Sequence, residues 1–361
     1  MVVLSACGTA GGGTDASGSA EVVDVDAAKA QVAADMKDPS GMGNQLLPLK
    51  AKPSSDTKVV WLACDIEPTC TNHGKGLEEA AAAAGVGFTR IAYQMSSVES
   101  LLAAFDHAMD LHPDAILLSA MPKAAYASKL PQLEAAGIPV VTAYTASTDV
   151  GGGVSATVAN QQTATAQFKA LANWTIADSG ATAKALVLNL PDFDYYQPGI
   201  KLLKDTLASA CRDCTPSVLD VATTDLAAGA VPGKVISALQ ADPSINYVLC
   251  VTGGASTGLS AALKAAGLDG KVTVGGQSAT PAVLQEIKSG DLFKAWTSTG
   301  TAQAAWAQMD QALRAIERSE VLPTGPELPI QLLTVSNIED VQTQYGTDPN
   351  FRATFEKLWN P

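Results

Sequence analysis

The sequence predicts an α/β protein of two similar halves, each a doubly wound parallel sheet with helices on both faces. Short apolar runs alternate with helical patterns from Lys58 onward, which is typical of parallel α/β layers. A loose, glycine-rich segment, residues 147–156, interrupts this alternation, which then begins again. The chain of 361 residues is also long enough for two domains of about 150 residues each.

The first half contains four apolar runs that we expect to be buried strands, with helical patterns between them. Apolar residues from Val98 to Met109 recur at helical spacing, so that segment buries one face, and Gly137 is well placed to end a helix. In chain order we expect strand 59–63, helix 76–84, strand 87–93, helix 98–109, strand 115–118, helix 124–136 and strand 138–142.

The second half repeats this pattern, and the two ends of the chain differ from it. We expect residues 25–36 to form a short helix joined to a proline-rich connector, and residues 348–359 to form a helix that packs its apolar face on the body. In chain order the second half is expected to contain helix 161–178, strand 184–189, helix 199–210, strand 217–221, helix 233–241, strand 247–251, helix 258–266, strand 271–274, helix 301–318 and strand 329–335.

Composition and charge exclude some classes of partner. Acidic residues outnumber basic ones by 36 to 23, and the net charge of −13 argues against nucleic acid or anionic lipid as a partner. No run approaches the roughly 18 apolar residues of a membrane-spanning helix. We therefore expect a protein that meets a membrane only through an attached lipid.

The cysteines after residue 60 form two short pairs and one single thiol. Cys64 and Cys70 are one candidate disulfide, Cys211 and Cys214 are the other, and Cys250 lies in an apolar run where a buried inert thiol is expected.

A zinc site of Cys64, Cys70 and His73 is the alternative for the first cysteine pair, but no second pair with the right spacing completes four ligands. With three histidines in the chain and none beside a recognisable nucleophile motif, hydrolytic chemistry has little support. We expect neither a metal nor enzymatic activity.

Six short sequence pieces occur in an order and spacing that resemble the type I periplasmic binding proteins of ABC importers, in particular the ribose-binding-like sugar family, over residues 57–337. The pieces are Lys58-Val59-Val60-Trp61, Pro113-Asp114-Ala115-Ile116-Leu117-Leu118, Ala136-Gly137-Ile138-Pro139-Val140-Val141-Thr142, Asp242-Pro243-Ser244-Ile245-Asn246-Tyr247-Val248, Val274-Gly275-Gly276-Gln277 with Thr280-Pro281, and Ile287-Lys288-Ser289-Gly290.

The resemblance implies two lobes that close over a small ligand and a complex that docks on an ABC permease with its ATPase. It implies a monomer, and a three-segment hinge that we place near residues 157–160, 297–300 and 325–328. The expected parts are a signal remnant and tether (1–20), an N-terminal extension and linker (21–56), an N-terminal lobe (57–158 plus 299–326), a C-terminal lobe (159–298 plus 327–337) and a helical tail (338–361).

Ligands of open α/β sheets bind beyond the carboxyl ends of the strands. This rule nominates ligand-binding residues in the loops after the strands, and two more candidates lie beside the expected crossings. They are Asp65, Glu67, Met121, Tyr144, Asp192, Phe193, Tyr195, Tyr196, Thr252 and Gln277, with Asn160 and Trp296 beside the crossings.

The charged residues that sugar sites of the resembled family usually carry are largely replaced here. Tyr144-Thr145 stands where that family has Asp-Arg, and Gly276-Gln277-Ser278 stands near its Phe-Asp-Gly. The aromatic and acidic run 192–196 either anchors a loop with a solvated rim or binds a neutral polyol, an aromatic compound or a cation. The paired glycines near 253 and 275 lack the spacing of a dinucleotide fingerprint, so no cofactor is expected.

Leu4-Ser5-Ala6-Cys7, followed by a glycine- and serine-rich stretch, resembles the lipobox of bacterial lipoproteins. The resemblance implies a lipid on Cys7 and a position outside the cytoplasm, anchored to the outer face of the cell membrane or periplasmic. Only six residues precede Cys7, so the segment is expected to be a signal remnant.

Two other functions remain as alternatives. The same fold serves a ligand-sensing partner of a membrane receptor, which neighbouring genes for a sensor kinase would favour. A cleft enzyme is the less favoured alternative, because no nucleophile and base are visible together. A transcriptional repressor would need an N-terminal DNA-binding helix pair, and the glycine- and serine-rich acidic segment there offers none.

Overall fold

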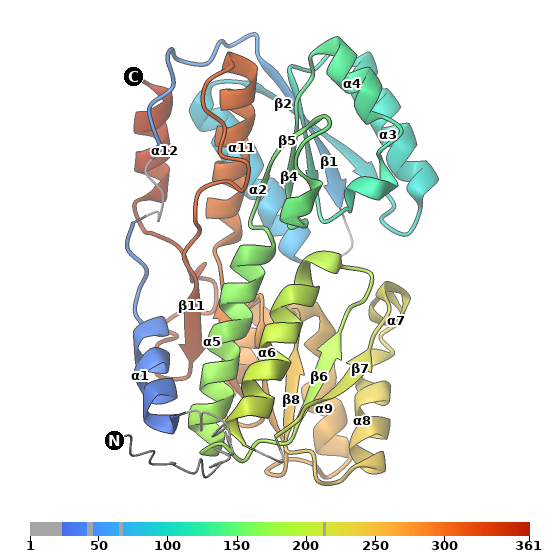
Figure 1. Ribbon diagram of the computed structural model, residues 1–361, viewed down its shortest axis with the longest axis vertical. Helices are drawn as coiled ribbons and strands as arrows, with labels where there is room; N and C mark the ends of the chain where they lie inside the picture. Colours follow the sequence, from blue (N-terminus) through green and yellow to red (C-terminus); the bar gives the residue numbers. More distant parts are fainter. Residues whose placement is uncertain (1–23, 42–45, 65–67, 212–213) are drawn as a thin grey trace, which may run out of the picture.

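The computed structural model describes residues 24–41, 46–64, 68–211 and 214–361, which form two α/β lobes (Figure 1). The sheet of lobe 1 has the strand order β2-β1-β3-β4-β5, and all its pairs are parallel. The sheet of lobe 2 has the order β11-β10-β9-β8-β6-β7 and is parallel except for β11, which runs antiparallel to β10. The predicted fold class of two doubly wound lobes is confirmed.

Lobe 1 forms because short apolar runs are buried on both faces of a parallel sheet. Every residue of the third strand is buried, and Gly137 ends α4 in the left-handed conformation that favours glycine, as predicted. The elements of lobe 1 are β1 (Lys58–Cys64), α2 (Pro68–Ala84), β2 (Gly87–Tyr93), α3 (Val98–Asp110), β3 (Ala115–Ser119), η1 (Lys123–Ala125), α4 (Leu130–Ala136), β4 (Val140–Ala143), η2 (Ser147–Asp149), β5 (Val154–Val158), α11 (Thr301–Glu317) and α12 (Phe351–Trp359).

Lobe 2 repeats the layers, with α5 and α6 on one face of its sheet and α8, α9 and α10 on the other. The helix α1 lies on the outside of α5 (Figure 1). The elements of lobe 2 are α1 (Val25–Asp35), α5 (Gln161–Ser179), β6 (Ala185–Asn189), η3 (Asp194–Tyr196), α6 (Gln197–Ala210), β7 (Ser217–Asp220), α7 (Thr223–Ala227), α8 (Val231–Ala241), β8 (Tyr247–Cys250), η4 (Gly253–Ser256), α9 (Leu259–Ala265), β9 (Thr273–Gln277), α10 (Pro281–Ser289), β10 (Phe293–Ser298) and β11 (Gln331–Thr334).

Five local predictions are wrong or incomplete. The segment expected to be loose ends in the strand β5, and the strand β10 and the helices α7 and α10 were not expected. The helix expected over 124–136 is instead η1 followed by α4, because Pro131 occupies the first turn of α4 and favours a helix start there.

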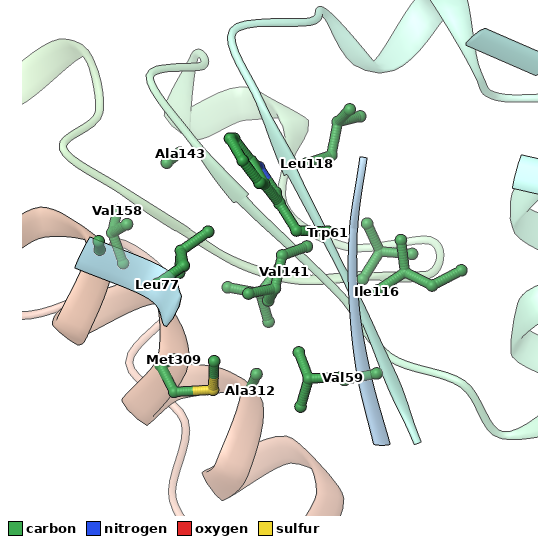
Figure 2. Packing of buried hydrophobic residues seen from close by; sticks show 14 of the residues in the cluster. Val59, Trp61, Leu77, Ile116, Leu118, Val141, Ala143, Val158, Met309 and Ala312 are labelled. Carbon is green, nitrogen blue, oxygen red and sulfur yellow. The ribbon is translucent and has the colours of Figure 1, made fainter. Parts of the chain in front are cut away.

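One part of the core of lobe 1 lies between the sheet and the helices α2 and α11 (Figure 2). Trp61 points from β1 into this layer, with Leu77 of α2 and Met309 of α11 nearby (Figure 2). Small side chains let the two helices approach closely: a Cβ on Gly76 would lie 2.8 Å from the Cβ of Ala305. Residues 302–314 of α11 are buried without interruption, so this helix is the centre of the lobe.

Five chain segments run between the lobes, whereas three were expected. Three follow β5, β10 and α11, near the expected positions. The two additional ones are the chain after α1 and the chain before α12 (Figure 1). The first crossing was expected to begin at Thr157. The Thr157 amide donates to the Pro323 carbonyl of the third crossing at 2.8 Å, so the two crossings are bonded to each other.

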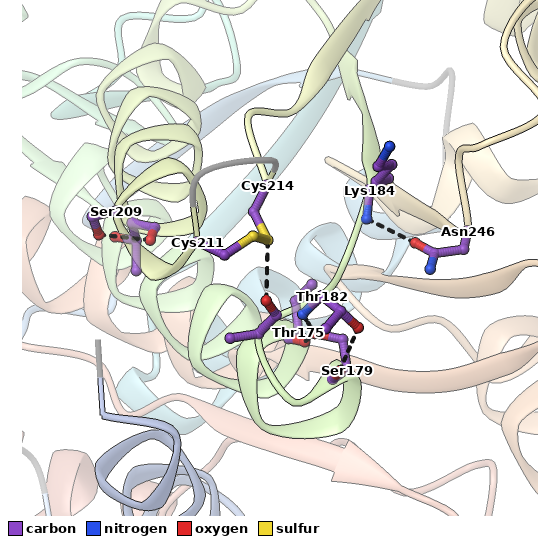
Figure 3. Close-up of a disulfide and its surroundings, with 10 residues drawn as sticks. Thr175, Ser179, Thr182, Lys184, Ser209, Cys211, Cys214 and Asn246 are labelled. Atoms are coloured by element: carbon purple, nitrogen blue, oxygen red, sulfur yellow. Dashed lines mark hydrogen bonds between the residues drawn. A yellow bond between two sulfur atoms is a disulfide. The ribbon is translucent and has the colours of Figure 1, made fainter. Parts of the chain in front are cut away.

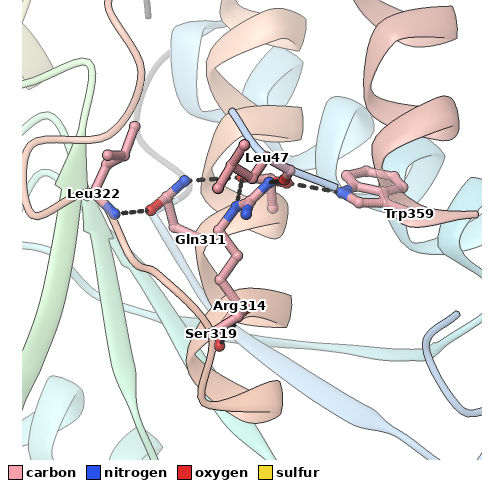
Figure 4. A network of polar contacts seen from close by, with 7 residues as sticks. Leu47, Gln311, Arg314, Ser319, Leu322 and Trp359 are labelled. Carbon is pink, nitrogen blue, oxygen red and sulfur yellow. Dashed lines mark hydrogen bonds and ion pairs between the residues drawn. The ribbon is translucent and has the colours of Figure 1, made fainter. Parts of the chain in front are cut away.

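The C-terminal helix and the chain segment at Leu47 are both held on lobe 1 by a buried polar network (Figure 4). Asp310 accepts hydrogen bonds from the Arg314 Nε at 2.7 Å, from the Gln311 amide at 2.8 Å and from the Trp359 indole at 3.0 Å. Arg314 also donates to the Leu47 carbonyl at 2.7 Å. The C-terminal helix therefore packs on the body, as predicted, and the N-terminal extension is tied to the same place.

The disulfides lie in both lobes. Cys211 and Cys214 form one at the end of α6, where the Cys214 sulfur lies 3.4 Å from the Ala181 carbonyl oxygen (Figure 3). Cys70 is also disulfide-bonded, and the side chain of its predicted partner, Cys64, lies outside the described residues. Cys250 is a buried free thiol, and its burial raises the pKa of the thiol.

Candidate functional site

A cavity of about 210 Å³ lies between the lobes, at the carboxyl ends of the strands of both sheets. Tyr144 of lobe 1 is partly buried and packs against the apolar cores of both lobes, so the lobes are in contact beside the cavity. The described residues that line the cavity are Cys70, Met95, Ala120, Tyr144, Leu190, Phe193, Tyr195, Tyr196, Thr223, Leu226, Ala227, Gly229, Val231, Pro232, Thr252, Gly254, Thr257 and Ser278.

An aromatic cluster from the segment that joins β6 to α6 forms one wall of the cavity. The ring centroids of Tyr195 and Tyr196 lie 4.1 Å apart, and that of Phe193 lies 6.0 Å from that of Tyr196. The Tyr196 ring also meets Phe168 of α5 edge-on at 6.2 Å. Asp192 accepts hydrogen bonds from the amide and the hydroxyl of Thr223, which fixes this segment against α7. The cluster is therefore rigidly supported.

A chain of hydrogen bonds inside lobe 1 orients Tyr144. The Gln308 amide nitrogen donates to the carbonyls of Leu118 and Val141 at 3.1 and 2.8 Å, so its oxygen accepts from the Nε2 of His73 at 2.7 Å. The Nδ1 of His73 then accepts from the Tyr144 hydroxyl at 3.2 Å. Burial lowers the pKa of His73 to about 4, so the imidazole is neutral at pH 7.

Four non-glycine residues with positive φ occur just after the strands that end at the cleft. Ala120 follows β3, Tyr144 follows β4, Ala159 follows β5 and Ser278 follows β9, with φ values of 60°, 59°, 46° and 57°. Each lines either the cavity or a small pocket of about 30 Å³ that shares Tyr144 with it. Such backbone strain persists only where the surrounding structure fixes it, and it is often found at binding sites.

Thr252 places an unpartnered hydroxyl at the cavity. It stands at the N-cap position of η4, yet its side chain makes no capping bond. The residue is 5% exposed and lines the cavity. Within the described part of the chain, its Oγ1 has no hydrogen-bond partner.

The cavity wall is uncharged over the described residues, and two further carboxylates, one from each lobe, interact electrostatically with each other. Asp149 of η2 is in lobe 1 and Asp194 of η3 is in lobe 2. Partial burial raises the pKa of Asp149, and the charge of Asp194 raises it further. Hydrogen bonding from the Lys123 amide, at 3.1 Å, opposes this shift.

The structure brings some of the nominated ligand-binding residues together and separates others. Tyr144, Phe193, Tyr195, Tyr196 and Thr252 line the cavity. Asp65 and Glu67 lie outside the described residues, as does Cys7.

Five nominated residues are absent from the cavity wall. Gln277 donates to the Val251 carbonyl at 2.7 Å, and Trp296 donates to the Gln277 carbonyl at 2.6 Å, so both side chains are directed into the core of lobe 2. Met121 belongs to the core of lobe 1, and Asp192 is held by Thr223.

Asn160 has a structural position at the first crossing. Its side chain caps α5 by accepting from the Gln162 amide at 2.8 Å, and its Nδ2 donates to the Thr324 carbonyl at 2.9 Å. It thereby joins the first crossing to the third.

Sequence reasoning missed the part of the wall that α7 and the start of α8 provide. The helix α7 has five residues, too few for a helical repeat of apolar positions to be visible. Met95 and Leu190 were also missed, although both follow strands and the strand-end rule covers their loops. The missed residues of the α7–α8 segment are Thr223, Leu226, Ala227, Gly229, Val231 and Pro232.

Comparison with known proteins gives one family match and several similar structures. A family described as a periplasmic binding protein domain matches residues 65–319. A 5-methylthioribose transporter solute-binding protein from Thermotoga lettingae is 15% identical, with a TM-score of 0.71 over 86% of this chain and 99% of that one. An ABC transporter solute-binding protein from Burkholderia graminis, in complex with D-arabinose, is 18% identical, with a TM-score of 0.69 over 80% and 98%.

A third structure is an ABC transporter solute-binding protein from Mycobacterium smegmatis with bound glycerol. It is 14% identical, with a TM-score of 0.68 over 80% of this chain and 99% of that one. No curated protein matches the chain. Within the described residues, no helix is long and apolar enough to cross a membrane.

Proposed function

The chain belongs to the periplasmic binding protein family, and from this premise we propose that it captures a small molecule between its lobes and delivers it to an ABC permease. Members of this family are transport binding proteins rather than enzymes, and the similar structures are solute-binding proteins of ABC transporters. The observation that carries the proposal is the cavity itself, whose wall is shared by both lobes at the carboxyl ends of their strands.

Closure of the lobes is the proposed working step. A ligand that contacts both lobes favours the closed arrangement, because it loses contacts when the lobes separate. The crossings are suited to such a hinge, since they are bonded to one another: the Thr299 hydroxyl of the second donates to the Pro329 carbonyl of the third at 2.8 Å.

The proposed location is outside the cytoplasm, with a lipid on Cys7 as the anchor. The disulfide of Cys211 and Cys214 fits an oxidising compartment. Labelling intact cells with radioactive palmitate tests the anchor: the label is expected on the native chain and absent from Cys7→Ala. Equal labelling of both chains would remove the anchor from the proposal.

The similar structures were solved with D-arabinose, 5-methylthioribose and glycerol, so a small neutral molecule is the starting expectation for the ligand. Thermal-shift and calorimetric titration of a panel of polyols, aromatic compounds and amines tests the function. At least one class is expected to bind and to raise the melting temperature. Small-angle scattering is expected to show a smaller radius of gyration with the ligand. The absence of binding in every class would contradict the proposal.

A further inference from the structure

We propose that the ligand is a neutral, mainly apolar molecule with an aromatic ring, which offers one hydrogen-bonding group to Thr252. This inference rests on the proposed function, because it names the class of molecule that the same cavity binds. It selects one of the three ligand classes that the sequence left open.

The cavity wall is apolar over most of its described surface. Aliphatic side chains such as Leu190, Leu226 and Val231 face it beside the aromatic cluster, and no described lining residue is charged. Ligand sites are usually apolar, with a few polar groups that fix the orientation of the ligand. Here the polar side chains of the wall are almost all hydroxyls.

Among the described residues that line the cavity, few side-chain hydroxyls are left to bond a ligand, which disfavours a sugar. The Thr223 hydroxyl already donates to Asp192, and the Tyr144 hydroxyl already donates to His73. Thr257 is exposed, which places its hydroxyl at the mouth of the cavity. A pentose has hydroxyls around its whole ring, and each buried hydroxyl left without a partner weakens binding. A molecule with one or two polar atoms avoids this loss.

A cation is also disfavoured by the described residues, because none of the carboxylates among them lines the cavity. The carboxylate of Asp192 is held by Thr223, and neither Asp149 nor Asp194 lines the cavity. Burying a positive charge without an ionised partner is costly, and aromatic faces alone offset only part of that cost.

The aromatic side chains favour a planar ring as the apolar part of the ligand. Tyr144 approaches from lobe 1, while Phe193, Tyr195 and Tyr196 stand on lobe 2. A ring placed between the two groups makes stacked or edge-to-face contacts with both lobes, so it couples ligand binding to closure.

Thr252 supplies the specific polar contact. Its buried hydroxyl lines the cavity and has no partner among the described residues, although buried hydroxyls in proteins are normally paired. A ligand hydroxyl or carbonyl beside Oγ1 completes this bond. The unpartnered hydroxyl and the apolar wall are independent observations, and both point to the same kind of molecule.

The test compares three probes by isothermal titration at pH 7: 2-phenylethanol, 2-phenylethylamine and D-arabinose. The first two differ only in that one carries a hydroxyl and the other an ammonium group, so the ratio of their affinities measures the effect of the positive charge. We expect 2-phenylethanol to bind at least tenfold more tightly than either of the others. Tighter binding of arabinose or of the amine would overturn the ligand class and leave the proposed function standing.

Variants test the contact with Thr252. Thr252→Val is expected to weaken 2-phenylethanol at least tenfold and to leave ethylbenzene, which lacks the hydroxyl, unchanged. The matched control, Thr257→Val, is expected to change either affinity less than twofold. The melting temperature of unliganded Thr252→Val should be unchanged or higher, because the unpaired hydroxyl is removed. Equal loss of both probes, or no loss of the alcohol, would overturn the contact.

Failure of the proposed function has a separate signature. Native mass spectrometry of the purified protein reports any small molecule that remains bound, whatever its class. If none of the three probes binds and the native mass is that of the protein alone, both the ligand class and the proposed function are contradicted.

Discussion

The two lobes share one architecture but differ in what lies inside them and in what they give to the cavity. Lobe 1 buries polar networks, the Asp310–Arg314 pair and the His73–Gln308 pair, around the helix α11. Lobe 2 buries mainly aliphatic and aromatic side chains and supplies most of the cavity wall. The difference indicates a division of roles. Lobe 2 supplies most of the surface that contacts the ligand, and lobe 1, which its buried polar networks hold rigid, closes over the ligand.

The largest effect is expected when the buried Asp310–Arg314 ion pair of lobe 1 is broken. Arg314 and Asp310 have side chains only 2% and 0% exposed, and Arg314→Met leaves the carboxylate buried without its ionic partner. We expect a loss of about 3–5 kcal/mol of stability. Hydrogen exchange followed by mass spectrometry should show faster exchange in α11 and α12 and little change in lobe 2.

The control for this prediction is the exposed pair of Lys201 and Asp205, where Lys201→Met is expected to change stability by less than about 0.5 kcal/mol. The double variant Asp310→Leu with Arg314→Met should recover much of the loss, because no unpaired charge remains. Equal destabilisation of both lobes by Arg314→Met would show that they do not unfold separately.

The second prediction concerns the loss of folding stability at acidic pH. Burial lowers the pKa of His73 to about 4 from 6.5, so the folded state binds fewer protons at this site than the unfolded state over that range. The stability contribution is complete above pH 6.5 and is lost as the pH falls toward 4, by about 3 kcal/mol in total. Urea unfolding at a series of pH values measures it.

His73→Gln is the matched variant, because its side chain does not titrate. The difference in stability between the wild type and His73→Gln should depend on pH only between about pH 6.5 and 4. A difference that is constant over this range would contradict the assignment.

The third prediction tests the packing of lobe 2. A Cβ on Gly276 would lie 2.4 Å from Cζ2 of Trp296 and 2.8 Å from the Cys250 carbonyl oxygen. Gly276→Ala should therefore cost about 1–3 kcal/mol and accelerate exchange in lobe 2. Gly233→Ala is the control: a Cβ there meets no atom within 4 Å, and alanine favours the helix by about 0.5–1 kcal/mol. Destabilisation by both variants alike would contradict the packing argument.

The smallest effect is expected at the contact between the lobes. Tyr144→Phe removes the hydroxyl that donates to the Nδ1 of His73 but keeps the ring that faces lobe 2. We expect a loss of about 1 kcal/mol in the stability of lobe 1, since a largely buried hydrogen bond is lost. Affinity for 2-phenylethanol should change less than twofold in calorimetry. A large loss of affinity would mean that the hydroxyl itself serves the ligand.

Sequence reasoning found the buried central strands, in which apolar side chains fill both faces, and also the largely exposed edge strands β2 and β7. β3 and β8 are buried throughout, and their apolar runs are visible without any structure. β5 was missed because Gly151, Gly152 and Gly153 precede it at positive φ and dominate the local pattern. β10 was missed because the exposed Lys294 and the polar residues at its end interrupt its apolar run.

The strand-end rule located the aromatic cluster, since it identifies which loops meet at the cleft. It does not identify where a side chain on a strand points. Gln277 and Trp296 were nominated by position, yet their side chains bond within lobe 2. The contribution of α7 depends on how that short helix packs beside the cavity, which no local pattern of residues encodes.

A crystal structure of the protein grown with 2-phenylethanol tests the central claim most directly. We expect electron density for the ring between Tyr144 of lobe 1 and the aromatic cluster of lobe 2, with the ligand oxygen within hydrogen-bond distance of the Thr252 hydroxyl. Density at another place on the molecule, or a ligand that contacts only one lobe, would contradict it.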